Sequence, residues 1–272
     1  MLRKAVAIAE SRGFKLIHGI VDSMWLKKPN ASDAEYREVC AQIEKELGLP
    51  ISFEGRYKWV VFLNSRINPK VPVLNRYYGV LEDGKLKVRG IDLRRHDTPE
   101  VIRRCQSDML TVLSQAEDSQ EFKKLIPRTL AIVKSYVSAL RTHEAPIEQL
   151  VVEKRLSKGT NQYTNLVPQV IAATHLAREG QETRAGQTVS YVVTNNESRT
   201  AGNRALPAEF LDESTCYDSE WYVNLILSSV VNLLLPFGYD VKSLRDRLSL
   251  DYFAFCGSGL RTCRTCTRRV LG

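Results

Sequence analysis

The side chain with the clearest potential for chemistry is Asp22, a carboxylate in the segment HGIVDS at residues 18–23. It lies between two short apolar runs, and this pattern predicts a β-hairpin with Asp22 at its turn. A single Asp after a hydrophobic strand is most often only a turn residue. Its chemical role therefore depends on the sequence around it.

Three cysteines near the end of the sequence suggest metal chemistry of another kind. Cys256, Cys263 and Cys266 have the spacing C-x6-C-x2-C. A structural zinc site uses four ligands, usually as two close pairs, and this spacing offers one pair and a single residue. We therefore do not expect zinc. Cys40 and Cys105 fall on apolar helical faces, so we expect buried thiols there.

The charge balance leaves two explanations open. The chain has a formal net charge of +8, which suits a nucleic-acid partner but also serves simple solubility. Lys154, Arg155 and Lys158 are concentrated in the segment EKRLSK, which is either a solvated face or a phosphate-binding strip. Residues 256–272 form a basic tail that contains the three cysteines.

Nothing in the sequence indicates a membrane or a secretory signal. The apolar stretch after Arg3 and Lys4 is only five residues long, and the longest apolar segment, 225–237, is too short to cross a bilayer. Hydrophobic residues make up 43% and charged residues 26% of the chain, which is ordinary for a globular protein. We expect a cytoplasmic protein.

Local patterns predict an α+β organisation. A helix ending at Gly13 precedes the hairpin, and a second helix begins at Ser32, where Glu35 completes a capping box, and ends at Gly48. Residues 51–95 are expected to be extended, with a hairpin turn at 83–84. Beyond them, Thr98 is expected to cap a helix that has Pro99 in its first turn.

After residue 98 the expected structure is mainly helical. The patterns predict helices to about residue 143, near 167–179 and from about Ser219, with a strand at 189–194. Coarsely, we therefore expect one α+β part up to residue 98 and a mostly α-helical part from 99 to 255.

The segment around Asp22 resembles the palm motif of family B DNA polymerases, usually written YGDTDS. The resemblance continues in order through ISFEGRYKWVVF, NRYYGVLEDGKLKVRGIDLRRHD, GQTVSYVV and YDSEWYVNLILSSVVNLLLPFGY, and so reaches from residue 1 to about 253. All these segments look like consecutive sequence blocks of archaeal enzymes of this family. Some archaeal members are split into a large and a small chain, and this sequence resembles the small one.

The resemblance implies that Asp22 is a catalytic residue that binds Mg²⁺. The two-metal chemistry of nucleotide addition needs several oxygen ligands, so one carboxylate cannot hold both ions. Another chain would then supply the other palm Asp and the fingers. Ile20 stands where the family has its first Asp, which is either a tolerated variation or a sign of an inactivated site. Glu54 matches a palm Glu near the metals, but a solvent-facing strand Glu is an equal alternative.

Two further blocks imply contacts with DNA. The segment LNRYYGV aligns with a KKRY motif that contacts the primer end, so Arg76 and Tyr77 keep its last two positions while Asn75 replaces a lysine. RGIDLRRHD resembles the family's RGxxxVRRD, in which Arg95 and Asp97 are kept. Arg95 is either a phosphate contact or a structural partner of Asp97.

The resemblance also implies that residues 99–255 are a polymerase thumb, which would grip duplex DNA through Lys154, Arg155 and Lys158; these side chains suit binding to phosphates regardless of base sequence. The segment SLDYFAF resembles a degenerate sliding-clamp-binding box, in which Leu250 and Phe253 fit; otherwise they belong to the thumb core.

The resemblance thus implies the end of a polymerase palm (1–98) and a thumb (99–255), followed by a tail (256–272). Its expected partners are a large polymerase chain, primer–template DNA, deoxynucleoside triphosphates and a sliding clamp. The alternative is a noncatalytic DNA-binding accessory subunit derived from such a polymerase.

Overall fold

A computed structural model describes residues 1–65, 68, 71–212 and 214–250. The chain divides into two compact units. The first comprises Met1–Gly90 and Ala116–Glu121, and the second comprises Ile91–Gln115 and the described residues from Phe122 to residue 250. The described part contains both helices and antiparallel sheets, so the α+β class predicted from the sequence is confirmed.

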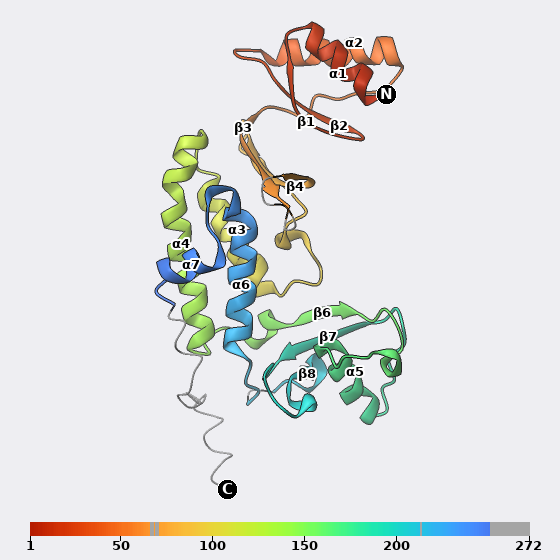
Figure 1. Ribbon diagram of the computed structural model, residues 1–272, viewed down its shortest axis with the longest axis vertical. Helices are drawn as coiled ribbons and strands as arrows, with labels where there is room; N and C mark the ends of the chain where they lie inside the picture. The colour runs from red at the N-terminus through yellow and green to blue at the C-terminus, as the bar shows by residue number, and fades with distance from the viewer. Residues whose placement is uncertain (66–67, 69–70, 213, 251–272) are drawn as a thin grey trace. The chain divides into compact units, whose positions relative to one another are not determined.

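The first unit combines two helices with two antiparallel sheets. One sheet is a two-stranded hairpin of order β1-β2, and the other has the order β3-β4-β5. The helices and the hairpin share a small apolar core (Figure 1). The elements are α1 (Leu2–Ser11), β1 (Lys15–Ile20), β2 (Ser23–Lys27), α2 (Asp33–Leu47), β3 (Tyr57–Asn64), β4 (Pro72–Leu81) and β5 (Leu86–Arg89).

Local signals account for the elements of this unit. The Ser32 hydroxyl accepts a hydrogen bond from the Glu35 backbone N–H, and the Glu35 carboxylate accepts one from the Ser32 N–H, so the predicted capping box is confirmed. Gly48 ends α2 with a left-handed φ of 64°, a conformation that glycine adopts without strain. Cys40 and Cys105 are both free; Cys105 is buried as predicted, whereas Cys40 is only half-buried.

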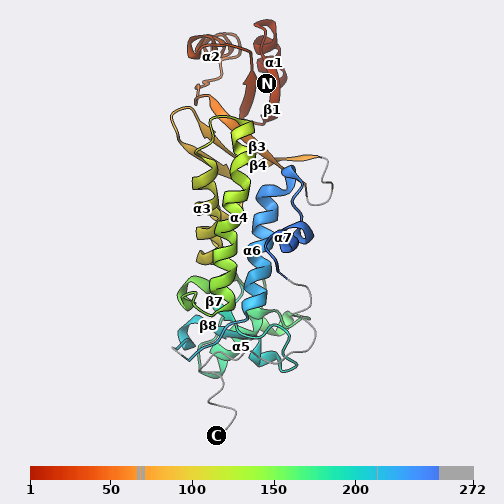
Figure 2. The ribbon, with the colours of Figure 1, turned by 90° about the vertical axis from the view of Figure 1, so that its left-hand side faces the viewer.

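The second unit contains a helical part and a three-stranded sheet of order β6-β7-β8. Helices α3, α4 and α6 run alongside one another (Figure 2), and α5 packs along strands β7 and β8 (Figure 1). The helices are α3 (Glu100–Leu113), α4 (Ser119–Arg141, whose first residues belong to the first unit), α5 (Pro168–Arg178), α6 (Ser219–Leu234) and α7 (Val241–Arg247). The strands are β6 (Val152–Arg155), β7 (Thr188–Val193) and β8 (Ala205–Pro207).

Six short 3-10 helices occur within the described residues, all in the second unit. They are η1 (Asp92–Arg94), η2 (Ile147–Leu150), η3 (Thr160–Gln162), η4 (Ala201–Asn203), η5 (Ala208–Phe210) and η6 (Leu235–Phe237).

Two expectations about element boundaries were wrong. Thr98 does not cap α3, because Pro99 has an extended ψ of 147° and its carbonyl accepts the first helical hydrogen bonds, from Ile102 and Arg103. Residues 51–56 are not a strand, and β3 begins only at Tyr57.

Helix α6 and the following 3-10 turn form a 19-residue stretch, Ser219–Phe237, that is long and apolar enough to cross a membrane by composition. Its side chains Tyr222, Ile226, Val230 and Leu233 are all completely buried in the second unit. Packing in the protein core therefore accounts for its apolar character.

Candidate functional site

Asp22 occupies the exposed turn of the β1–β2 hairpin, as the sequence predicted. Ile20 pairs with Ser23 across the hairpin, so Val21 and Asp22 form a two-residue connection. The Ser23 hydroxyl donates a hydrogen bond to Asp22 Oδ1 over 3.3 Å. The carboxylate thus faces solvent and keeps oxygen lone pairs for further ligands.

Aromatic packing holds the hairpin against the larger sheet of the first unit. The His18 ring is almost completely buried, with its centroid 5.1 Å from that of Trp25 and 4.4 Å from that of Phe62. The Tyr77 ring on β4 lies 5.2 Å from Trp25 in an edge-to-face arrangement. This aromatic cluster gives the Asp22 turn a fixed base on the sheet.

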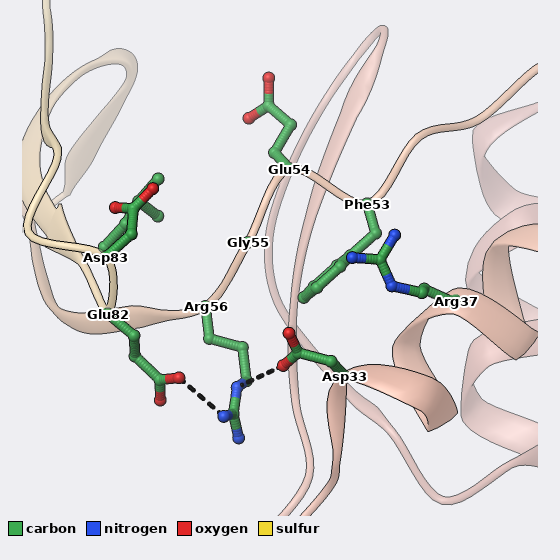
Figure 3. Close-up of a pocket in the computed structure, with 9 residues that line it drawn as sticks. Asp33, Arg37, Phe53, Glu54, Gly55, Arg56, Glu82 and Asp83 are labelled. Carbon is green, nitrogen blue, oxygen red and sulfur yellow. Dashed lines mark ion pairs between the residues drawn. The ribbon is translucent and has the colours of Figure 1, made fainter.

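Glu54 lines the same groove as Asp22 but is already paired. The groove encloses about 930 Å³ within the first unit. The Glu54 carboxylate forms an ion pair with the Lys87 ammonium, and its side chain is 71% exposed. The carboxylate is directed away from the guanidinium of Arg56 (Figure 3). The metal-binding role of Glu54 stays a prediction, and a metal ion would compete with the Lys87 ammonium for the Glu54 carboxylate.

A small pocket of about 180 Å³ lies beside Glu54. Inside it the Arg56 guanidinium joins two carboxylates, Asp33 at 2.8 Å and Glu82 at 2.7 Å (Figure 3). Arg56 also donates to the backbone carbonyl of Ala31. These ion pairs connect the start of α2 to the end of β4 within the first unit.

The structure places Arg76 and Tyr77 in different environments. The Tyr77 side chain is buried to 8% exposure in the aromatic cluster, which gives it a packing role. Arg76 Nε donates to the Gly90 carbonyl over 3.0 Å. Asn75, which stands in the place of a lysine in the KKRY resemblance, is exposed.

Arg95 and Lys154 meet at one carboxylate in the second unit. Arg95 binds Asp97 through two parallel hydrogen bonds, each of 2.9 Å, and Lys154 forms an ion pair with the same group. These two cations hold the pKa of Asp97 far below its usual range, and Asp97 in turn raises the pKa of Arg95. The structural salt bridge considered from the sequence is therefore present.

The other two predicted thumb cations have local partners. Arg155 Nε donates to the Gly186 carbonyl over 2.7 Å. The Lys158 ammonium lies 5.0 Å from the centroid of the Tyr163 ring, a cation–π distance. Both contacts leave N–H donors for a further anion, because Arg has five such donors and Lys has three.

Of the residues predicted to bind a clamp, Leu250 and Phe253, the structure describes only Leu250. Leu250 is described and is buried at 7% exposure, as a core residue would be. Phe253 and the three cysteines of the tail lie outside the described residues. In the part of the chain that is described, no three His, Cys, Asp or Glu side chains gather as a metal-binding group.

Sequence reasoning did not single out Gln106, a completely buried amide on α3. Its oxygen accepts a hydrogen bond from the Leu93 N–H over 2.8 Å, and its nitrogen donates to the Ser229 carbonyl over 3.1 Å. A lone Gln in a helix gives no signal of such a position. Its partners are known only once α3, α6 and the 3-10 turn η1 are placed together.

Comparison with known proteins decides the family. The sequence model of the family described as DNA polymerase family B matches residues 3–237 of this chain. The chain belongs to DNA polymerase family B. Among curated relatives, it is 26% identical over 270 residues to a DNA polymerase of Archaeoglobus fulgidus, an alignment that covers 93% of this chain and 32% of that protein.

Further similar proteins are also DNA polymerases that are longer than this chain. A DNA polymerase of Desulfurococcus sp. is 29% identical over 247 residues, which cover 88% of this chain and 30% of that enzyme. The structure of the family B DNA polymerase from Pyrobaculum calidifontis matches with a TM-score of 0.62 and 24% identity, over 88% of this chain and 29% of that one. The chain thus corresponds to about a third of these longer polymerases.

Proposed function

We propose that this chain contributes one part of a DNA polymerase active site and acts with a second, larger polypeptide. Residues 1–98 would be the end of the palm, residues 99–255 the thumb, and residues 256–272 a basic tail. The observation that carries the proposal is the exposed Asp22 at a hairpin turn in a chain that matches family B over residues 3–237.

Asp22 fits Mg²⁺ by its chemistry, because this ion prefers carboxylate oxygens and Asp22 is exposed with only a weak hydroxyl partner. When bound, the metal would activate the primer hydroxyl and neutralise charge on the triphosphate. The fixed base of the hairpin would keep the Asp22 carboxylate in one place. Further ligands would come from the larger polypeptide, with Glu54 as a second candidate from this chain.

The remaining predicted residues suit a hold on primer–template DNA. Lys154, Arg155 and Lys158 would bind phosphates on the thumb, and Arg76 would lie near the primer end, with Tyr77 supporting it from the aromatic cluster. Contacts of this kind position the duplex without reading bases. Base pairing with the template would supply the sequence information.

The other partners follow from this role. Deoxynucleoside triphosphates would be the substrates, and the cytoplasm is the place where we expect the protein to act. A sliding clamp would be bound through the segment that contains Leu250 and Phe253, although the burial of Leu250 favours the core alternative.

Primer extension by the chain together with its large partner tests the catalytic proposal. Asp22→Asn keeps the size of the side chain but removes the negative charge that holds the metal, so we expect the extension rate to fall by about 100-fold or more. Asp83→Asn is the matched control, because Asp83 is an exposed turn carboxylate whose oxygen accepts from the Lys85 N–H, which Asn can also accept. Undiminished synthesis by Asp22→Asn would overturn the catalytic role.

The noncatalytic alternative has specific support. Ile20 replaces the first Asp of the palm motif, and Glu54 is neutralised by Lys87. If the accessory function is correct, both duplex binding and synthesis by the reconstituted pair will survive Asp22→Asn. Copurification tests the earlier question of whether this chain has a large polymerase partner at all.

A further inference from the structure

A short basic segment at the start of the second unit contains a cation that has not been given a role. Arg94, Arg95 and His96 are consecutive and all exposed. Arg95 is held by Asp97 through two hydrogen bonds. No hydrogen bond or ion pair of the Arg94 guanidinium occurs among the residues that the structure describes.

The backbone that carries Arg94 is held in place by the surrounding unit. Gln106 accepts from the Leu93 N–H over 2.8 Å, and the Asn232 amide donates to Asp92 Oδ2 over 3.0 Å. The Arg94 N–H itself donates to the Ile91 carbonyl, and Ile91 is buried at 1% exposure. The main chain is therefore ordered before any ligand arrives.

This order lowers the entropic cost of a contact by Arg94. Binding would immobilise only one side chain, whereas a flexible loop would also lose backbone freedom. The local charge also favours an anion, because Arg94, Arg95 and Lys154 outnumber the carboxylates Asp92 and Asp97. A guanidinium with a free planar face of N–H donors is well suited to bind two oxygens of one phosphate.

We infer that Arg94, rather than Arg95, is the residue of this segment that binds a backbone phosphate of duplex DNA. The sequence is consistent with a relocation of charge, because Arg94 stands at the position of Val in the RGxxxVRRD resemblance while His96 replaces an Arg. Arg95 then acts structurally, by joining the segment to Asp97. This inference rests on the proposed DNA-binding function and assigns that function to a particular side chain.

The test measures binding of the full chain to a fluorescein-labelled primer–template duplex by anisotropy, over a series of salt concentrations. Arg94→Ala should weaken binding by roughly three- to ten-fold and lower the slope of log K against log salt by about 0.9, the value for one lost phosphate contact. Arg94→Lys keeps the charge, so it should retain the wild-type salt slope, and it should weaken binding less than Arg94→Ala does, because an ammonium cannot bind two phosphate oxygens in parallel as a guanidinium can. Arg178→Ala, an exposed arginine on α5 of the same unit, is the matched control and should bind as the wild type does.

Three results would count against the inference, and they differ from one another. If Arg94→Ala binds with the wild-type affinity and salt slope, Arg94 is not a phosphate contact although the chain still binds DNA. If Arg95→Ala, with an unchanged circular dichroism spectrum, loses more affinity than Arg94→Ala, the contact belongs to Arg95. If the wild-type chain itself shows no salt-dependent binding, the proposed hold on the duplex fails, and the inference fails with it.

Discussion

At the scale of single residues, Asp97 illustrates how one carboxylate can organise a surface. Its two oxygens accept hydrogen bonds from Arg95. Oδ2 also accepts one from Lys154 on β6, which is 57 residues further along the chain. The Asp97 side chain is 29% exposed, so solvent weakens these pairs only in part. The carboxylate therefore connects the start of α3 to β6.

Asp97→Asn should destabilise the protein by roughly 1–2 kcal/mol at neutral pH, because it removes the charge that both cations share. Since the folded-state pKa of Asp97 is lowered, its stabilisation is fully present above the unfolded value of about 3.9 and is lost as the pH falls further toward the folded-state pKa. The difference in free energy of unfolding between wild type and variant should therefore shrink below about pH 4. Urea titrations at several pH values measure it.

Glu153→Gln is a suitable control for this experiment, since Glu153 is an exposed carboxylate on β6, the strand that carries Lys154. It should change stability little at any pH. Equal effects of the two substitutions would contradict a special role of Asp97.

At the scale of elements, the central strand β4 depends on the absence of a side chain at Gly79. This residue pairs with Val60 on one side and Lys87 on the other. A Cβ atom there would lie 2.7 Å from the Trp59 carbonyl oxygen and 3.0 Å from the Val60 Cα, which are backbone atoms that cannot move without disturbing β3.

Gly79→Ala should therefore cost about 2 kcal/mol of stability, as overpacked positions do. Thermal unfolding measures this as a lowered Tm. Gly19→Ala on β1 is the control, because its Cβ would have only ordinary contacts, the nearest being 3.6 Å from a Leu2 side-chain atom. A Tm for Gly79→Ala equal to that of the control would show that β4 can shift at little cost.

The sequence predicted those elements whose signals are local. The hairpin around Asp22 and the capping box at Ser32 depend on residues close together in the chain, and both were confirmed. Strands β6 and β8 have only four and three residues, too few to show an alternating pattern, so the expected mainly helical part also contains a sheet.

The candidate site was less predictable for the same reason. The placement of Asp22 in an exposed turn follows from nearby residues. The pairing of Glu54 with Lys87 joins positions 33 residues apart, and that of Asp97 with Lys154 joins positions 57 apart. Such partners are determined by tertiary packing, which no local pattern specifies.

At the scale of the whole molecule, the chain leaves the first unit and returns to it for a short excursion. Residues 116–121, between α3 and the body of α4, belong to the first unit. The indole N–H of Trp59 donates to the Ala116 carbonyl over 3.0 Å, and Lys58 pairs with Glu117 at 2.7 Å. Trp59 is buried at 4% exposure, so its bond to Ala116 is protected from water.

Trp59→Phe should destabilise the attachment of this excursion by about 1–3 kcal/mol, because it leaves a buried carbonyl without its donor and reduces packing. Hydrogen exchange followed by mass spectrometry should show faster exchange at residues 116–121, while α6 keeps its protection. Trp221→Phe makes the same change on α6 and should leave residues 116–121 unaffected. Unchanged exchange of this segment in Trp59→Phe would argue that other contacts hold it.

The excursion at residues 116–121 also restricts how units of this kind can be recombined among homologues. A hybrid gene with a single crossover after codon 90 would combine β3 from one parent with residues 116–121 from another. Trp59 and Lys58 would then meet a segment that had not been selected alongside them. Viable chimaeras should therefore inherit these two stretches from the same parent. Trp59 and Ala116 are 57 positions apart in the sequence, but they form one block in the folded protein.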